Sequence, residues 1–498
     1  GKRTESPGRV CQKTLAGNSN YGKPMRTDHQ NPLHAFAEWT SDVDAHWSQL
    51  ATTRASNALT DVVAVMIPGA RETVSAKVCS LASDWGAGNC SAVGFEPGLS
   101  APMAALVNGT SAHAIDFDDN FDPAKAHATA VLAPALLALA EDRDMNGKAV
   151  IDAYIVGLQI IGRVGQGVNP FHRNRGWHAT ATVGAVGSAS GCARLLGLNR
   201  HETANAISLA TSMCGGFMSQ FGTMAKPLHA GLAASGAVKA ALFAEAGITA
   251  GDQTLHGSNG MGTLMVGQDV EHLRASMVGK AEHGQTVRFA TEDIGTPLMI
   301  EEYGLKVKRF PNCGSVHRSL DGLLALREKH GFTADTVKEI FVRAPASHLR
   351  NLMYDRPVNG LQAKFSLEYG MAVGLLRGQA GLAEYADDMV MDADIQALLP
   401  ITRKEYVEKM ESEFPTEVHV TLKDGTRFSV SVKMPVGSTA APLSQAQLLE
   451  KFDSCAQGHL SAETAISVKG MLANLANDQP IRPLMASLGM PQDIKSDR

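Results

Sequence analysis

In one long region of the chain, apolar residues recur at three- and four-residue intervals, and many of the residues between and among them have small side chains. The pattern runs from Leu33 to about Ile300 and predicts the helices Ala51–Val65, Met103–Ala114, Val131–Glu141, Ala149–Val164, Val183–Leu196, Glu202–Ser212 and Gly231–Ala246. Ala, Gly and Ser on the inner faces let helix axes approach closely, which favours a tightly packed all-α body. The aromatic content of 5% agrees, because large rings are not needed where backbones nearly touch.

The pattern changes after Tyr303, where alternating β-branched residues predict strands. These are Val337–Arg343, Glu417–Lys423 and Arg427–Lys433, the last two joined by a hairpin turn at Asp424–Gly425. Helical periodicity also marks Leu320–His330, Ala363–Leu376, Ser444–Leu449 and Ala462–Ala476. We therefore expect a mostly α protein with a large all-α domain built from both ends of the chain, residues 25–303 and 437–498. A smaller α+β lid domain is inserted at residues 304–436, and the cleft between the two is the expected site.

Residues 1–24 fall outside this pattern. They are polar, poor in acidic residues, and contain no apolar stretch of the kind that a secretory signal needs. We expect a disordered extension ahead of a start near Met25, with a targeting segment as the alternative.

Charge and cysteine content exclude several classes of function. The chain has 45 Lys+Arg against 50 Asp+Glu, a net charge of -5, and no basic run, so nucleic acid is not an expected partner. No stretch of about eighteen uninterrupted apolar residues predicts a membrane span. The seven cysteines are scattered without a CxxC pair, which fits neither a disulfide scaffold nor a zinc site. These features predict a cytoplasmic protein.

The segment His113–Asp122 (HAIDFDDNFD) is the most unusual in the chain because it holds four carboxylates within seven residues. A calcium loop fails, since Phe121 occupies the glycine position and His127 stands where a bidentate Glu belongs. A magnesium-binding DDxxD box of prenyl-transferring enzymes would need a second acidic box, and DDMVMD at 387–392 has the wrong spacing. An acidic, solvated turn between helices remains an alternative.

Three further segments carry basic and imidazole side chains. His178 follows a glycine at a predicted helix start (GWHAT), where the helix N-terminus disfavours an imidazolium and attracts anions. Lys226 and His229 lie three residues apart in GTMAKPLH, and Lys308 and His317 flank the proline turn of KRFPNCGSVH at the junction into the inserted domain. A buried lysine among small apolar residues needs an anion to meet. Each segment also has a plain interpretation as a core histidine, a solvated lysine or an exposed linker.

Taken together and in this order, HAIDFDDNF, GWHAT, GTMAKPLH and KRFPNCGSVH resemble the MmgE/PrpD family over roughly residues 30 to 490. That family includes 2-methylcitrate dehydratase, cis-aconitate decarboxylase and iminodisuccinate epimerase. The resemblance implies a homodimer with a helical domain and an α+β lid, a small anionic carboxylate substrate, and chemistry without a metal or organic cofactor. By motif, the implied site residues are Asp116, Asn120, His127, His178, Lys226, Lys308 and Tyr354.

The residue types indicate how such a site would work. Lys226 and Lys308 are suited to neutralising a carboxylate and the enolate-like charge that develops beside it, with Asn120 as a polar contact. His127 and His178 are the expected acid–base pair, with Asp116 orienting one imidazole, and His229 and His317 are further substrate-binding candidates. Catalysis is thus assigned to His127, His178, Asp116 and Lys226.

Several outcomes of this chemistry remain open. The first hypothesis is a cofactor-independent lyase, a dehydratase or decarboxylase, acting on a small di- or tricarboxylate by proton transfer beside a carboxylate. The second is an epimerase of an imino- or amino-dicarboxylate, because His127 lies eleven residues after Asp116, a spacing similar to that of the epimerase branch. Asn120 replaces a usual hydroxyl residue, which leaves a third hypothesis of a non-catalytic helical dimer that binds carboxylates.

Overall fold

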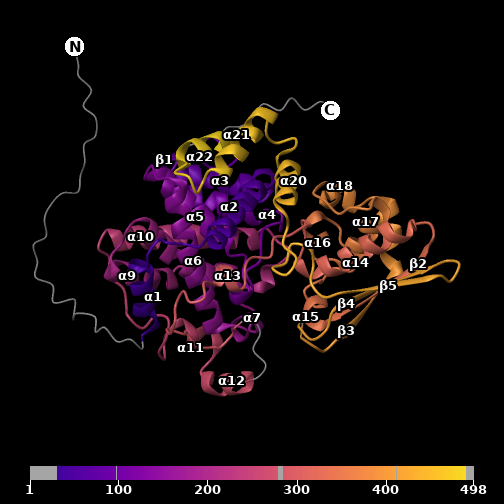
Figure 1. The fold of residues 1–498 in the computed structure, drawn as a ribbon, viewed down its shortest axis with the longest axis horizontal. Helices are drawn as coiled ribbons and strands as arrows, with labels where there is room; N and C mark the ends of the chain where they lie inside the picture. Colours follow the sequence, from indigo (N-terminus) through magenta and orange to yellow (C-terminus); the bar gives the residue numbers. More distant parts are fainter. Residues whose placement is uncertain (1–30, 97, 279–283, 411, 490–498) are drawn as a thin grey trace, which may run out of the picture.

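The computed structural model describes residues 31–96, 98–278, 284–410 and 412–489. Two bodies lie side by side, a larger helical one and a smaller one that contains the sheet (Figure 1). The predicted extension 1–24 lies outside the described residues. In the described part of the chain, helices long and apolar enough to cross a membrane are absent.

The larger body consists of helices, as the small-residue pattern predicts. Its long helices are α1 (Pro32–Asp42), α2 (Gln49–Gly69), α3 (Thr73–Trp85), α4 (Ala101–Ala114), α5 (Thr129–Asp142), α6 (Gly147–Val168), α8 (Ala179–Leu195), α9 (Arg200–Thr211) and α10 (Ala225–Glu245). All seven helices predicted for this region are present. The short elements are β1 (Ala87–Cys90), η1 (Asp122–Ala124), α7 (Phe171–Asn174), η2 (Met218–Gln220), α11 (Met261–Val266), α12 (Val270–Met277) and α13 (Met299–Glu302).

Glycine allows the closest helix contact in this body. Helices α4 and α10 pack against each other, and a Cβ on Gly109 would lie 2.9 Å from Gly231 Cα. A Cβ on Gly231 would come within 2.2 Å of Thr110 Oγ1 and 2.3 Å of the Leu106 carbonyl oxygen. The two backbones therefore touch at this crossing, as the small inner residues predict.

The helical pattern was expected to run almost throughout to about Ile300, but it is interrupted after α10. Residues 247–260 form no helix, and residues 284–298 form none either. Gly247 follows the end of α10 with a positive φ of 85°, a conformation that ends helices, and Gly257 turns the chain again with a φ of 91°.

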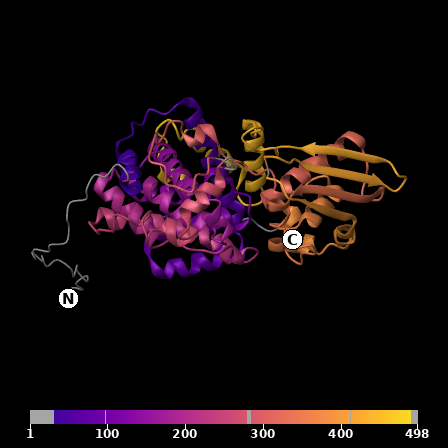
Figure 2. The ribbon, with the colours of Figure 1, turned by 90° about the horizontal axis from the view of Figure 1, so that it is seen from below.

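The smaller body contains a four-stranded sheet in the order β3-β2-β4-β5. Its strands are β2 (Val337–Pro345), β3 (Thr402–Val407), β4 (Thr416–Leu422) and β5 (Arg427–Val432). The β2–β4 and β4–β5 pairs are antiparallel, and β2–β3 is parallel. Figure 2 shows the long β4–β5 hairpin reaching away from the helical body. The predicted strands and hairpin are therefore present.

Helices fill the rest of this body. They are α14 (Gly314–His330), α15 (Ala346–Leu349), α16 (Gly360–Ala363), α17 (Leu367–Arg377), η3 (Ala383–Tyr385), α18 (Asp387–Val390), α19 (Ala393–Leu398) and η4 (Leu399–Ile401). Helix α14 packs against α17 and against β4 and β5, and α17 packs against β3. Strand β3 was not predicted because its residues, TRKEYV, are mostly polar, as an edge strand allows.

The buried apolar residues form two separate clusters. One extends from Leu33 to Ile300 and includes Phe452 to Leu488, and the other extends from Phe310 to Val420. The C-terminal helices α20 (Gln445–Ala456), α21 (Ala462–Ala473) and α22 (Ile481–Gly489) thus complete the larger core (Figure 1). The protein is mostly α, and the predicted domain boundaries and lid role of residues 304–436 stay predictions.

Two contacts hold the loop between α4 and η1 in place. Asn120 and Lys306 exchange backbone hydrogen bonds of 2.9 Å in both directions, which ties the loop to the segment entering the smaller body. From α20, the buried Lys451 ammonium pairs with Asp61 at 2.6 Å and donates to the Phe117 carbonyl oxygen at 2.9 Å. The loop is therefore anchored by parts of the chain that lie far away in sequence.

Candidate functional site

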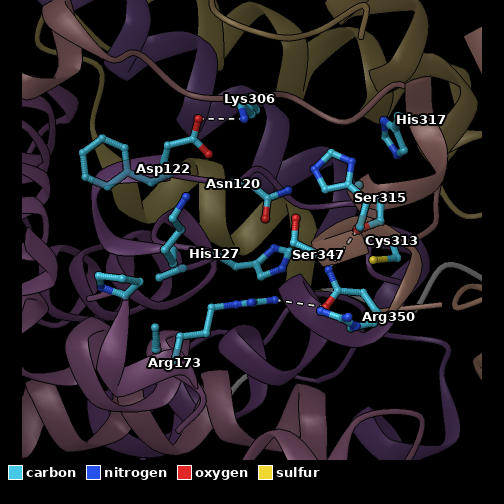
Figure 3. Close-up of a pocket in the computed structure, with 18 of the residues that line it drawn as sticks. Asn120, Asp122, His127, Arg173, Lys306, Cys313, Ser315, His317, Ser347 and Arg350 are labelled. Atoms are coloured by element: carbon cyan, nitrogen blue, oxygen red, sulfur yellow. Dashed lines mark hydrogen bonds and ion pairs between the residues drawn. The ribbon is translucent and has the colours of Figure 1, made fainter. Parts of the chain in front are cut away.

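A cavity of about 660 Å³ lies where the two bodies meet, and residues of both line it. Figure 3 shows side chains from the two bodies facing this space, among them His127 and Asn120 from the helical body and Cys313 and Ser347 from the other. Seven of the nine predicted site residues line it: Asp116, Asn120, His127, His178, Lys226, Lys308 and His317.

Asp116 lies at the centre of a compact ion-pair group. It follows the end of α4 in a left-handed conformation with φ 56°, which turns its side chain away from the helix path. Its Oδ1 lies 2.6 Å from Lys226 Nζ and 3.0 Å from Lys308 Nζ, and Lys308 also donates to the Asp116 carbonyl oxygen at 2.7 Å. Burial alone would raise the pKa of Asp116, but the two ammonium groups outweigh it and hold that pKa below its ordinary value.

His127 is held by a different carboxylate, Asp118. His127 Nδ1 lies 3.2 Å from Asp118 Oδ2, and the same oxygen lies 2.8 Å from Nδ1 of His113. Burial lowers the pKa of His113 to about 4, so His113 is neutral near pH 7 and donates Nδ1–H to Asp118. The His127 side chain keeps 14% exposure at the cavity wall, while Asp118 has none. A buried His–Asp–His chain therefore ends in one imidazole that reaches the cavity.

This arrangement corrects the expected role of Asp116. Asp116 was expected to orient one imidazole, yet its Oδ1 lies 4.0 Å from His127 Nε2 and is engaged by Lys226 and Lys308. The carboxylate of Asp116 pairs with the two lysines, which lie closer to it, and the imidazole of His127 pairs with Asp118 instead.

His178 stands at the start of α8, where a helix start was predicted, and is almost completely buried. Its Nδ1 lies 3.0 Å from Nδ1 of His229, and its ring stands edge-on to Phe221 with 5.0 Å between centroids. Burial, together with the nearby His113 and Lys226, holds the pKa of His178 well below its ordinary value. His178 is thus a neutral imidazole at the cavity wall near pH 7.

Two predicted residues do not line the cavity. His229 lies behind His178 and contacts it, because Lys226 and His229 share a helix of which only the first turn reaches the opening. Tyr354 packs its hydroxyl against Gly222, where a Cβ would come within 2.4 Å of that oxygen. Its backbone N–H donates to the Phe365 carbonyl oxygen.

The remaining predicted residues face the opening from the loop before η1 and from the first turn of α14. Asn120 directs its amide towards the start of α14, 3.6 Å from where a Cβ on Gly314 would lie. His317 is buried against Phe310, and burial with the neighbouring Lys308 lowers its pKa to about 3. His317 therefore offers a neutral imidazole and not a cation.

Sequence reasoning missed three residues of this site. His113 and Asp118 lie within the acidic segment, but their link to His127 depends on how the loop folds back. Arg173, on α7, lines the cavity and donates to Asn351 Oδ1 at 3.1 Å. The position of Arg173, five residues before His178, was the available signal, because both lie close to the start of α8.

The same group also has the residue types of a metal site. His113, Asp116, Asp118 and His127 offer ligand atoms within 4.8 Å of one another, a donor set that zinc or iron accepts. Lys226 and Lys308 contact Asp116 directly, and their charges would repel a divalent cation there. The donor set therefore fits its hydrogen-bonded and ion-paired arrangement better than a metal.

Comparison with known proteins covers most of the chain. Residues 34–273 match the MmgE/PrpD N-terminal domain, and residues 310–476 match the MmgE/PrpD C-terminal domain. Similar proteins include the cis-aconitate decarboxylase of Homo sapiens, 28% identical over 77% of this chain and 79% of the relative. The cis-aconitate decarboxylase of Aspergillus terreus is 25% identical over 90% of this chain and 95% of the relative.

Proposed function

Since the chain belongs to the MmgE/PrpD family, we propose that it is a lyase that decarboxylates an unsaturated tricarboxylate of the cis-aconitate type without a cofactor. The names of its relatives support this substrate class. The observation that carries the proposal is the buried Asp118–His127 pair beside two lysines that share one carboxylate. The pair can supply a proton, and the lysines can hold an anion.

The charge balance of the lysine group favours an anionic substrate. Lys226 and Lys308 contribute two positive charges, and Asp116 contributes one negative charge. The group is therefore a net cation at the edge of a low-dielectric cavity, where an anion is attracted more strongly than in water.

The proposed step needs one proton and no oxidant. The bond to the departing carboxylate breaks, and its electron pair forms a new C=C bond to the neighbouring carbon. The original C=C pair moves to the carbon beside another carboxylate, where the charge spreads as in an enolate. A proton then adds to that carbon, and carbon dioxide leaves. The lysine group is suited to stabilising the enolate-like charge.

His127 is the proposed proton donor. Asp118 Oδ2 lies 3.2 Å from its Nδ1 and can stabilise the protonated imidazole, while Nε2 is left for proton transfer. The cavity reaches His127 but not the buried Asp118, so the imidazole is the group that would meet substrate. His178 is proposed as the second member of the pair, accepting or donating a hydrogen bond as a neutral imidazole.

Proton NMR of the EDTA-treated protein in deuterium oxide tests the proposal. With cis-aconitate, we expect new vinylic signals, release of carbon dioxide, and one deuterium incorporated beside a carboxylate. Citrate and 2-methylcitrate test for the dehydratase outcome in the same tube format. Silence across all three substrates would contradict the lyase and favour the non-catalytic hypothesis.

The epimerase alternative is favoured by one observation, the eleven-residue spacing from Asp116 to His127. With an imino- or amino-dicarboxylate, an epimerase would exchange an α-proton for deuterium without forming a new product. That outcome would displace the decarboxylase proposal. The homodimer, the cytoplasmic location and the closing motion of the smaller body stay predictions.

A further inference from the structure

Arg173 differs from the lysines of the cavity because its partner carries no charge. Lys226 and Lys308 face Asp116, and Lys306 faces Asp122 at 2.7 Å. Arg173 forms no ion pair within the described residues, and its guanidinium Nη2 donates to the neutral amide oxygen of Asn351. A guanidinium has five donors, so most of its hydrogen-bonding capacity is not used by this amide.

The surroundings of Arg173 make an unpaired charge costly. The side chain is half-buried, and burial lowers its pKa, with the Cys313 side chain rather than a carboxylate opposing the effect. An anion that enters the cavity stabilises such a cation, because the ion pair compensates for the interactions with water that the cation has lost. Arg173 also lines the cavity, so an anion can reach it (Figure 3).

A chain of hydrogen bonds within the protein orients Arg173 across the cleft. Asn351 lies just beyond α15 in the smaller body, and its Nδ2 donates to Ser315 Oγ at 3.0 Å. A line of hydrogen bonds thus runs from α7 of the helical body through Asn351 to the first turn of α14. Asn351 accepts a hydrogen bond from Arg173 but carries no charge. The guanidinium is therefore held in place while its positive charge remains available to an anionic ligand.

We propose that Arg173 binds the distal carboxylate of the substrate and thereby selects tricarboxylates over dicarboxylates, with Asn351 as its positioning residue. This inference rests on the proposed function, since it specifies the substrate class of the same site. The Lys226–Lys308 group receives the carboxylate next to the reacting carbon. Arg173 receives a second carboxylate with its planar fork, which suits bidentate binding.

Binding measurements test the inference without requiring turnover. Isothermal titration calorimetry compares tricarballylate (propane-1,2,3-tricarboxylate) with methylsuccinate (propane-1,2-dicarboxylate), which lacks one terminal carboxylate. For Arg173→Gln, we expect affinity for tricarballylate to fall about 10- to 100-fold, the usual effect of losing a charge-assisted bond. Affinity for methylsuccinate should change less than about twofold. The affinity of Arg173→Lys for tricarballylate should lie between those of the wild type and Arg173→Gln, because lysine keeps the positive charge but lacks the planar, two-donor guanidinium.

Two further variants separate charge from position. Asn351→Asp places a carboxylate against Arg173, so it should reduce tricarballylate binding as Arg173→Gln does while leaving the guanidinium in the chain. Arg175→Gln removes the same charge two residues away, where Arg175 donates to the Val266 carbonyl oxygen outside the cavity lining, and should bind both ligands like the wild type. Melting temperatures verify that each variant is folded.

The outcomes distinguish this inference from the proposed function. Equal weakening of both ligands by Arg173→Gln, or no weakening of either, would overturn the role of Arg173. Wild-type protein that binds neither ligand would overturn it together with the tricarboxylate substrate class. Tight binding of tricarballylate that depends on Arg173, without any turnover of cis-aconitate, would support the inference and contradict the decarboxylase.

Discussion

At the scale of single residues, the function of the site depends on which carboxylate serves which partner. Asp116 and Asp118 are two residues apart, yet one is committed to two lysines and the other to two histidines. The left-handed backbone at Asp116 separates the two side chains, so each meets a different set of groups. This division makes distinct predictions for the two carboxylates.

Replacing Asp118 should affect proton transfer more than binding. In Asp118→Asn, the amide no longer stabilises a protonated His127, so we expect kcat for the decarboxylation to fall about 100-fold with KM little changed. The pH–rate profile should shift as well, which a purely structural change would not cause. Asp142→Asn, at the exposed end of α5, is the control. Wild-type kcat in Asp118→Asn would rule out the assigned role.

Asp119 should make stability depend on pH. Burial, partly offset by the Thr129 hydrogen bond, raises the pKa of Asp119 to about 7, whereas the unfolded value is 3.8. Between about pH 4 and 7, the folded carboxyl keeps its proton while the unfolded one has lost it. Rising pH therefore reduces the free energy of unfolding, by up to about 1.4 kcal/mol per pH unit. Urea titrations should show a flatter pH dependence in Asp119→Asn, and parallel curves would contradict this assignment.

At the scale of elements, the glycines between α4 and α10 set how closely the helices pack. Gly231→Ala should lower the free energy of unfolding by about 1–3 kcal/mol, because its Cβ would meet backbone and the Thr110 side chain. Gly470, in α21, has no atom within 4 Å of a new Cβ, so Gly470→Ala should raise stability by about 0.5–1 kcal/mol. Chemical denaturation of both variants measures this contrast, and equal effects would refute it.

Helix α20 should stabilise the loop through one buried ion pair. In Lys451→Met, Asp61 is left buried without its counter-charge, where burial already raises its pKa, so the free energy of unfolding should fall by about 3–5 kcal/mol. The double variant Asp61→Leu with Lys451→Met should recover part of that loss. Lys469→Met breaks an exposed pair with Asp453 of the same 2.6 Å length and should cost no more than about 1 kcal/mol. Similar losses in the two lysine variants would argue against a special role for burial.

At the scale of the whole molecule, the cavity between the bodies should couple ligand binding to stability. A ligand that contacts residues of both bodies binds the assembled protein and not the unfolded chain. Tricarballylate at 100 times its dissociation constant should therefore raise the free energy of unfolding by about 2.7 kcal/mol. Differential scanning fluorimetry at increasing ligand concentration measures this effect. An unchanged melting temperature, despite binding seen by calorimetry, would contradict it.

The sequence predicted the fold better than the connections within the site. Helical periodicity identified α2, α4, α5, α6, α8, α9 and α10 because their buried faces repeat with the helix, but it did not identify α1 and α3. Alternation identified β2, β4 and β5. It failed at β3, where an edge strand carries charges. The site histidines and lysines stood out as polar groups in apolar surroundings.

Partnerships across the cleft could not be predicted in the same way. Arg173 and Asn351 are 178 residues apart, and nothing in either local pattern points to the other. The pairing of Asp118 rather than Asp116 with His127 depends on one backbone angle that the amino-acid order does not reveal. Motifs thus locate chemical groups, whereas the fold decides which groups meet.

The placement of α20 also has a consequence for how the protein is made. Synthesis proceeds from the N-terminus, so Asp61 leaves the ribosome almost 400 residues before Lys451 exists to neutralise it. Until then, the nascent helical body holds a buried acid without its counter-charge, and the loop that carries Asp116 and Asp118 lacks its anchor at Phe117. In a newly made chain, the loop that carries Asp116 and Asp118 would therefore reach its final position last, after the smaller body has already been synthesised.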